Sequence, residues 1–219
     1  PILHYLNEKI IVSNEVIVNH LAYNFAPGRK TVFKDIIKLK PGNVITYKNN
    51  TFKNRNIIFK NDLKINFKKK TYETIKNELK DKLNLAIKRQ TISDAKLGCF
   101  LSGGLDSSTI VYFASKNRPD METFCIRGDW EKNNPDEADS KYAKDAADFL
   151  KVKLNYVDVS PENLFLNLKF MINSLEEPIC DPAAISTYLI SKVAKDMGIK
   201  VLLSGIGGDE VFGGYRRHM

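Results

Sequence analysis

The second half of the chain alternates between short apolar runs and longer segments in which apolar residues recur every three or four positions. The short runs have the length of buried strands, and the longer segments have the periodicity of helices. This alternation predicts an α/β fold, a parallel sheet with helices on both faces. The predicted strands are residues 96–101, 121–128, 153–160 and 199–204, and the predicted helices are residues 107–116, 135–150, 160–177 and 182–198.

The first part of the chain has a different pattern, which predicts a small β-rich module over residues 1–58. Residues 8–21 are expected to form a short strand and a short helix. Two strands are expected within residues 38–59, joined by a turn at Asn49-Asn50, because Asn tolerates the backbone conformations of tight turns. The second predicted domain is residues 59–219, and its basic, Asn-rich start resembles a connection between domains.

A long helix is predicted to begin at Thr71, where the pattern changes to helical spacing. Apolar residues there recur at intervals of three and four, which indicates one apolar stripe packed on a core. The stripe consists of Tyr72, Ile75, Leu79, Leu83, and Ala86 or Ile87.

Composition limits the class of protein. The chain has 219 residues, of which 43% are hydrophobic, enough for a sizeable core. No apolar run approaches the roughly 18 residues of a membrane span and no signal pattern is present, so the expected location is the cytoplasm without a membrane partner.

The net charge of +8 comes mostly from lysines interspersed with acids, which is typical of a solvated surface and does not favour nucleic acid. Cys99 and Cys125 lie in apolar runs and are expected in the core.

The stretch "FLSGGLDSST", residues 100–109, follows the first strand of the predicted sheet. Gly103 and Gly104 let the backbone approach a ligand closely and direct N–H groups towards it. The helix expected to begin near Ser107 adds the positive end of its dipole. The loop is therefore suited to an anion, most simply phosphate.

Side chains of the same loop extend this interpretation. Ser102, Ser107 and Ser108 can donate hydrogen bonds to phosphate oxygens. Asp106 would repel a phosphate directly, but a magnesium ion between the two would turn the repulsion into attraction. The alternative is a plain strand-to-helix turn with Ser or Asp as the N-cap.

A second Gly-rich loop, "SGIGGDEVFGGYRR" at residues 204–217, follows the last predicted strand. Loops at the carboxyl ends of parallel strands meet at one edge of a sheet, where ligands bind. The alternative for Asp209-Glu210 within it is a charged helix start. The chain contains no G-x-x-x-x-G-K-[ST] string, so γ-phosphoryl transfer of the kinase type is not favoured.

The first loop, "SGGLDSS", resembles the pyrophosphate-binding loop of the ATP-pyrophosphatase (PP-loop) superfamily. The second loop, together with "EEPICDPAAISTYLISKVAKDMGIKV", resembles the glutamine-hydrolysing asparagine synthetase family. The resemblance covers almost the whole chain, since "YLNEKIIVSNEVIVNHL" and "VFKDIIKLKPGNVITY" are similar to the last strands of that family's glutaminase domain. It implies that residues 1–58 are a remnant of the glutaminase domain. Residues 59–219 would then be an ATP-binding synthetase domain, adenine nucleotide alpha hydrolase-like and incomplete at its C-terminus.

The resemblance also implies a site for Mg-ATP. Leu101 and Ile126 would contact the adenine or ribose, and Asp106 and Asp209 would share Mg²⁺. The remaining nucleotide-binding positions would be Ser102, Gly103, Gly104, Ser107 and Ser108 for the pyrophosphate portion, completed by Ser204 and Gly205 from the second loop.

The implied reaction is ATP-dependent amide formation. A substrate carboxylate, by default that of aspartate, would attack the α-phosphorus of ATP and give an acyl-adenylate and pyrophosphate. Ammonia would then attack the acyl carbon and release AMP. The enzyme would position the carboxylate and neutralise the pyrophosphate, without a covalent protein nucleophile.

Three departures from the family pattern qualify these expectations. The family's glutaminase uses an N-terminal cysteine, whereas this chain begins at Pro1, so glutamine hydrolysis is not expected. The chain ends at Met219, before the family's later helices, which indicates a fragment or truncated product. Many family members carry an acidic residue where this chain has Ile206, which puts aspartate as the substrate in question.

Several alternatives stay open at this stage. The carboxylate could be one other than aspartate, as in amidotransferases of secondary or cell-surface metabolism. The chain could belong to a tRNA-modifying adenylating enzyme, which would share "SGGLDSS" and show salt-sensitive tRNA binding. It could also be an inactive nucleotide-binding fragment. Ammonia would come from solution or from a glutaminase domain, and a homodimer is compatible with the sequence.

Overall fold

The structure, a computed structural model, describes residues 11–57, 70–133, 138–175, 177–179 and 181–215. The chain divides into two compact units. The larger consists of Thr71–Met171 and Ala183–Met219, and the smaller of Pro1–Lys70 and Ile172–Pro182.

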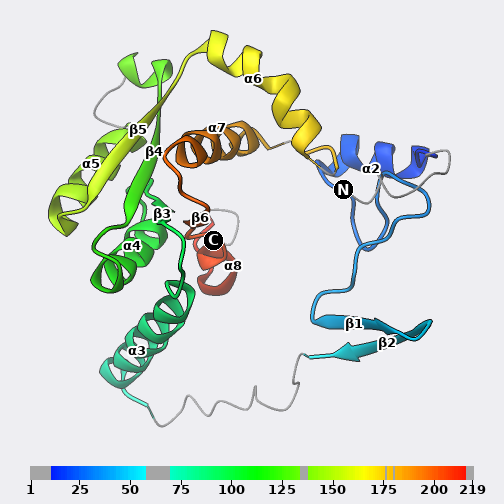
Figure 1. Cartoon of the computed structure of the whole chain (residues 1–219), viewed down its shortest axis with the longest axis horizontal. Coiled ribbons are helices and arrows are strands. Elements are labelled where there is room, and N and C mark those ends of the chain that lie inside the picture. Colours follow the sequence, from blue (N-terminus) through cyan, green and yellow to red (C-terminus); the bar gives the residue numbers. More distant parts are fainter. Residues whose placement is uncertain (1–10, 58–69, 134–137, 176, 180, 216–219) are drawn as a thin grey trace. The chain divides into compact units, whose positions relative to one another are not determined.

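The larger unit is built on a four-stranded parallel sheet with the order β5-β4-β3-β6 (Figure 1). Its strands are β3 (Leu97–Phe100), β4 (Glu122–Gly128), β5 (Lys153–Val159) and β6 (Val201–Leu203). The residues of β3 and β4 are mostly apolar and largely buried, as expected for strands covered on both faces. The predicted parallel α/β sheet is confirmed.

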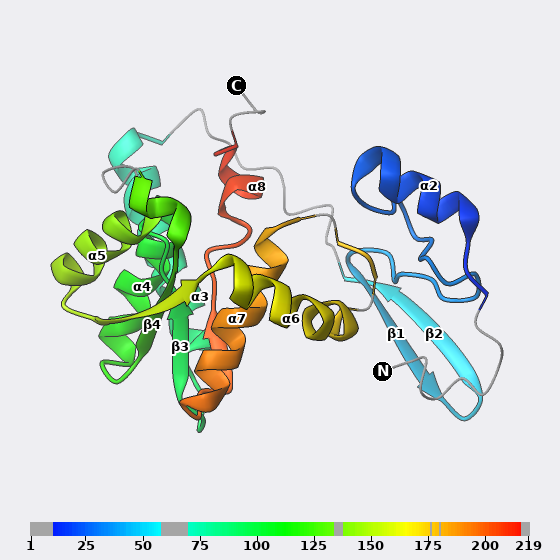
Figure 2. The same ribbon diagram turned by 90° about the horizontal axis from the view of Figure 1, so that it is seen from above.

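Helices cover both faces of this sheet. On one face α4, α5 and the end of α3 pack over a core that includes Leu97, Val111 and Ala143. On the other face α7 packs over Phe124 and Val157 (Figure 2). The helical elements are α3 (Tyr72–Gln90), α4 (Leu105–Asn117), η3 (Asp129–Asn133), α5 (Asp139–Leu150), α6 (Pro161–Ser174), α7 (Ala183–Asp196) and α8 (Gly208–Phe212).

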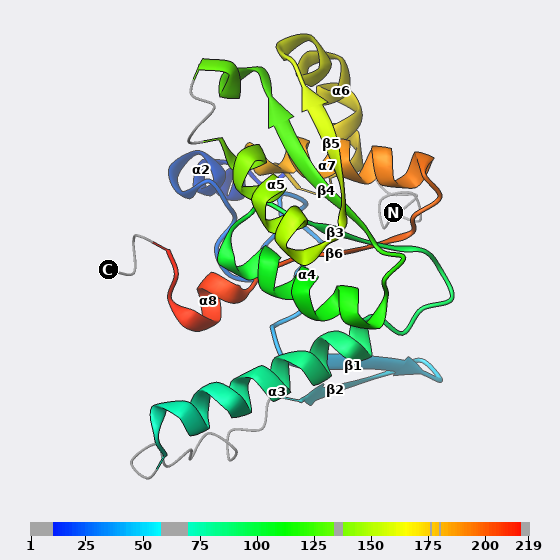
Figure 3. The same ribbon diagram turned by 90° about the vertical axis from the view of Figure 1, so that its left-hand side faces the viewer.

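Two predictions about helices need correction. The apolar stripe of α3 is buried only near its C-terminal end: Ile87 is 4% exposed, whereas Tyr72 is 78% exposed because this end of the helix extends past the sheet (Figure 3). Helix α4 begins at Leu105 and not near Ser107, because Gly104 is already in the extended conformation of an N-cap.

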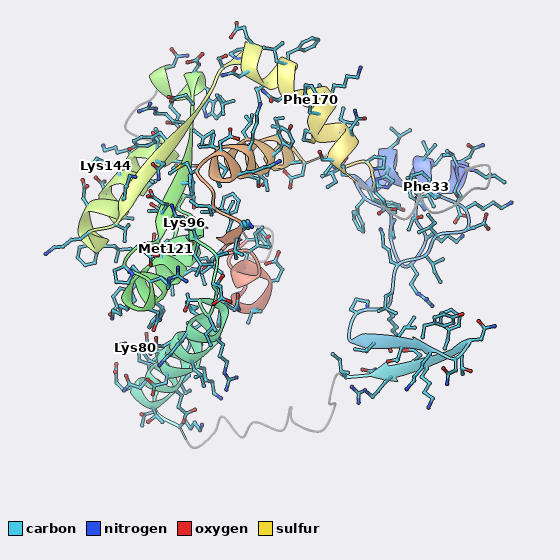
Figure 4. All side chains as sticks on the ribbon, in the orientation of Figure 1. Phe33, Lys80, Lys96, Met121, Lys144 and Phe170 are labelled. Atoms are coloured by element: carbon cyan, nitrogen blue, oxygen red, sulfur yellow. The ribbon has the colours of Figure 1, made fainter. Side chains whose placement is uncertain are left out.

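The two cysteines Cys99 and Cys125 lie in the core, whereas Lys144 and the apolar Phe170 are exposed. Cys99 and Cys125 are both buried, as predicted, and burial raises the pKa of each thiol to about 12. Lys144 on α5 and Phe170 on α6 lie on outer surfaces of their helices (Figure 4). Within the described residues, no helix is both long and apolar enough to cross a membrane.

The smaller unit contains α2 (Asn14–Tyr23) and a hairpin of β1 (Asn43–Lys48) and β2 (Thr51–Asn56). Asn49 and Asn50 both have positive φ, 50° and 59°, as a two-residue hairpin turn of the I′ type requires, so the predicted turn is confirmed. The predicted strand before α2 and the connection after residue 59 lie largely outside the described residues. Glu177 lies in Ile172–Pro182, the later segment that belongs to this unit, and forms an ion pair with Lys38 at 2.8 Å.

Candidate functional site

Both Gly-rich loops leave the sheet at its topological switch point. The chain passes from β3 outward to β4 and β5, and then returns to place β6 on the other side of β3. The loops that follow β3 and β6 therefore leave neighbouring strands at the same edge. In open α/β sheets this crevice is where ligands bind.

The first loop is held in position by its backbone and by α5. Leu101 is fully buried, and its N–H donates to the carbonyl of Phe124 at 2.8 Å. Gly103 has a φ of +80°, and a Cβ on it would lie 2.3 Å from the carbonyl carbon of Tyr142 and 2.5 Å from the nitrogen of Ala143. A larger residue would thus meet both backbone strain and helix α5, so only glycine fits.

The serines of this loop fall into two groups. Ser102 and Ser107 stabilise the loop itself, since their hydroxyl oxygens lie 3.0 Å apart and Ser107 also donates to the carbonyl of Gly104 at 3.2 Å. The Ser108 hydroxyl is buried and has no hydrogen-bond partner in the described structure. A buried hydroxyl without a partner is costly, and a ligand oxygen at this helix start would satisfy it.

The second loop packs directly against the first. A Cβ on Gly205 would lie 2.8 Å from the backbone nitrogen of Ser107. A Cβ on Gly208 would lie 2.3 Å from Oδ2 and 2.4 Å from Cγ of Asp106. The two glycines therefore allow the loops to touch, and the structure brings Asp106 and Ser107 together with Gly205.

The other residues of the predicted site differ in how deeply they are buried. Ile126 is half-buried on β4, whereas the side chain of Leu101 belongs to the core, so Leu101 can meet a ligand only through its backbone. The hydroxyl of Ser204 accepts a hydrogen bond from the N–H of Ile206 at 3.2 Å, and the Ile206 side chain is 89% exposed. Asp209 lies in the first turn of α8, so the sequence there also starts a helix.

The donor set fits a magnesium ion shared with a ligand better than a protein-only metal site. The described residues contain no group of three or more His, Cys, Asp or Glu side chains arranged to hold a metal. Asp106 and Asp209 are both half-buried, and Asp106 contacts the residue that precedes Asp209. Mg²⁺ is commonly held by one or two carboxylates together with substrate phosphates.

Sequence reasoning missed a pocket of about 460 Å³ at the carboxyl ends of β4 and β5. One wall is Arg127, which forms two hydrogen bonds with Asp158, 2.6 and 3.0 Å long, and lies 4.4 Å above the ring of Tyr156. The Asp158 partner raises the pKa of Arg127. Spacing along the chain gives no sign of this pocket, since its walls come from separate segments.

The fold and this loop pair define an α/β protein of the parallel, open-sheet class with its candidate site at the switch point. A comparison with known protein families identifies the family: residues 78–219 match the asparagine synthase family. The chain belongs to that family, as its motifs predicted.

Individual relatives agree with this assignment. The chain is 33% identical over 208 residues to asparagine synthetase (glutamine-hydrolysing) 1 of Bacillus subtilis, covering 94% of the chain and 32% of that protein. It is 29% identical to a putative asparagine synthetase (glutamine-hydrolysing) 2 of Methanocaldococcus jannaschii, covering 98% of the chain and 41% of that protein. The chain therefore spans about a third to two fifths of the length of these relatives.

Among solved structures, an NH3-dependent NAD synthetase from Campylobacter jejuni matches with a TM-score of 0.43 and 13% identity. The match covers 64% of this chain and 60% of that one.

Proposed function

We propose that this chain is the ATP-binding part of an enzyme that activates a carboxylate by adenylation and passes the acyl group to ammonia, forming an amide. AMP and pyrophosphate would be the other products. The default substrate is aspartate, on the strength of the relatives' names. The exposed, apolar Ile206 beside the site leaves room for a different carboxylate.

The observation that carries this proposal is the contact between the two loops at the switch point. Gly205 meets the backbone of Ser107 and Gly208 meets the carboxylate of Asp106. A polyphosphate at the start of α4 would thus have donors from the first loop and the second loop on either side. Because α4 is a 13-residue helix, its N-terminus also provides the positive end of a substantial dipole.

Each residue has a definite task in this proposal. Backbone N–H groups near Gly103 and Gly104 and the hydroxyl of Ser108 would bind the pyrophosphate portion. Ser102 and Ser107 would keep the loop open, through the hydrogen bonds they make to each other. Asp106 and Asp209 would hold Mg²⁺, which when bound neutralises charge on the leaving pyrophosphate.

The nucleotide contacts proposed for Leu101, Ile126, Ser204 and Gly205 would fix the rest of ATP. The assignment of residues 1–58 as a glutaminase remnant and of residues 59–219 as a synthetase domain belongs to the same proposal. Ammonia would come from solution or from a glutaminase domain.

The test is calorimetric titration of the chain with ATP and Mg²⁺, paired with an assay for pyrophosphate release. Asp106→Asn should weaken Mg-ATP binding at least tenfold, because a carboxylate that holds the metal is lost. Asp196→Asn, which makes the same charge change at the exposed end of α7, is the matched control and should bind like wild type. Equal binding by wild type and Asp106→Asn would refute the site.

Pyrophosphate release with aspartate, with other carboxylates and with ammonia distinguishes the remaining alternatives. Turnover that depends on one carboxylate identifies the substrate. Binding of ATP without any turnover would support a nucleotide-binding fragment. Salt-sensitive binding of tRNA, with a slope set by phosphate contacts, would instead favour a tRNA-modifying enzyme.

A further inference from the structure

We propose that the turn after α8, residues 213–215, positions the carboxylate of Asp209, and that Tyr215 locks this turn in place. The inference rests on the proposed function, in which Asp209 shares a magnesium ion with the bound polyphosphate, and deepens it. Gly214 and Tyr215, which make none of the proposed nucleotide contacts, are thereby positioning residues.

The turn folds back onto the start of α8. The helix ends at Gly213, whose φ of 75° and ψ of 36° place it in the left-handed conformation of a glycine cap. The N–H groups of Gly213 and Gly214 both donate to the carbonyl of Asp209, at 2.9 and 3.3 Å. The chain therefore reverses at once and returns to the side of Asp209.

Gly214 lies directly against the Asp209 carboxylate. A Cβ on Gly214 would overlap Oδ1 of Asp209 and lie 3.1 Å from its Cγ. The φ of Gly214 is not positive, so backbone strain does not explain a glycine here. Glycine provides space for the carboxylate at this position, because any side chain would displace Oδ1.

Tyr215 ties the same turn to the neighbouring acid. Its O–H donates to Oε1 of Glu210 at 2.7 Å, a length typical of a hydrogen bond to a carboxylate. Tyr215 is half-buried, and Glu210 lies beside Asp209 in the first turn of α8. The turn is therefore fastened twice, by its glycines to the backbone of Asp209 and by its tyrosine to the side chain of Glu210.

Helix α8 depends on these contacts because it is short. It has five residues, and isolated helices of fewer than roughly 12 residues are marginal in water. None of its residues is buried, so core packing contributes little to holding it. The hydrogen bonds of the turn therefore help to fix the first turn of α8, and Asp209 with it.

The direction of the Asp209 carboxylate matters for the metal. Mg²⁺ requires near-ideal octahedral geometry, whereas Ca²⁺ accepts more irregular arrangements of oxygen ligands. Removing a group that orients a metal-binding side chain typically lowers metal affinity by about 10- to 100-fold. A turn that fixes Asp209 should therefore raise both the affinity for Mg-ATP and the preference for Mg²⁺ over Ca²⁺.

The experiment measures binding of ATP by calorimetry, once with Mg²⁺ and once with Ca²⁺, to wild type, Gly214→Ala and Tyr215→Phe. Gly214→Ala should weaken Mg-ATP by about 10- to 100-fold, because the added methyl group displaces the carboxylate. Tyr215→Phe should weaken it roughly three- to tenfold, since one hydrogen bond is lost and the space for the carboxylate is kept. Ca-ATP binding should fall less in both variants, so the ratio of the two affinities narrows.

Tyr47→Phe is the matched control. It removes the hydroxyl that donates to Asn50 in the hairpin of the smaller unit, and it should bind both complexes like wild type. Melting temperatures followed in parallel show whether each variant is folded. If Gly214→Ala does not fold, Tyr215→Phe decides the question.

The outcomes separate this inference from the proposed function. Unchanged Mg-ATP affinity in Tyr215→Phe, or in folded Gly214→Ala, overturns the inference. Equal losses for Mg-ATP and Ca-ATP also overturn it, because a turn with a purely structural role would weaken both complexes alike. In each of these cases wild type still binds Mg-ATP. Failure of wild type to bind Mg-ATP overturns the proposed function, and the inference with it.

Discussion

Gly208→Ala should separate the stability of the fold from the function of the candidate site. The added Cβ would lie 2.3–2.8 Å from three atoms of the Asp106 carboxylate, where ordinary contacts begin at 3.4 Å. The carboxylate must therefore move by about 1 Å, and Asp106 can do so by rotating its side chain at a cost of about 0.5–1.5 kcal/mol. Against this, Gly208 is the first residue of α8 and its φ is not positive, so replacing it by Ala stabilises by about 0.4–1 kcal/mol by restricting the unfolded chain.

These two contributions nearly cancel, so the melting temperature should change little. The displaced carboxylate should instead affect function, because moving a catalytic or metal-binding group by about 1 Å lowers activity on the order of 100-fold. We expect Mg-ATP binding to weaken by about 10- to 100-fold, measured by calorimetry, with the melting temperature followed in parallel.

A double-mutant cycle and a control substitution at the neighbouring glycine test whether displacement of the Asp106 carboxylate causes the loss of binding. In the Asp106→Asn background, the further change Gly208→Ala should add little, because the group it displaces has already lost its charge. Gly207→Ala is the matched control: Gly207 has a φ of +104° with no atom within 4 Å of its Cβ position, so it should lower stability through backbone strain without touching Asp106. Wild-type affinity in Gly208→Ala would refute the reasoning, and so would equal losses in both backgrounds.

Three further predictions concern the fold. Gly98→Ala should destabilise the larger unit by about 1–3 kcal/mol in urea unfolding, because its Cβ would lie 2.8 Å from Cδ2 of Leu202; unchanged stability would mean that the sheet relaxes freely. Thr71→Ala should cost about 1 kcal/mol, since the Thr71 hydroxyl caps α3, and Thr71→Ser should recover most of it in the same assay. Cys99 and Cys125, with pKa values of about 12, should resist alkylation at pH 8 in the native chain and react after unfolding, as checked by mass spectrometry; rapid native labelling at either would contradict their burial.

The sequence predicted the sheet well because each strand carries its own local signal. Runs such as residues 96–101 are apolar, short and bounded by turn residues, and β3 lies within that range. The hairpin turn at Asn49-Asn50 was predictable for the same reason, since the two residues that need positive φ are both Asn.

Features that depend on distant segments were not predictable. The stripe on α3 looks continuous in sequence, but only its last turns meet the core, and periodicity does not say where a partner surface ends. The closeness of Gly208 to Asp106 joins positions about a hundred residues apart, and the order of the strands alone brings them together. The pocket beyond β4 was missed because its walls come from β4, η3, α5, β5 and α6.

The position of β6 has a consequence for the order in which the molecule assembles. β6 is three residues long, begins at Val201 and pairs with β3, about a hundred residues earlier in the chain. During synthesis β3 therefore remains an unpaired edge until this late segment arrives, and long-range parallel pairing of this kind is slow. The crevice between the loops forms only at that step, so a growing chain would gain a hydrophobic core before it gained a place to bind a nucleotide.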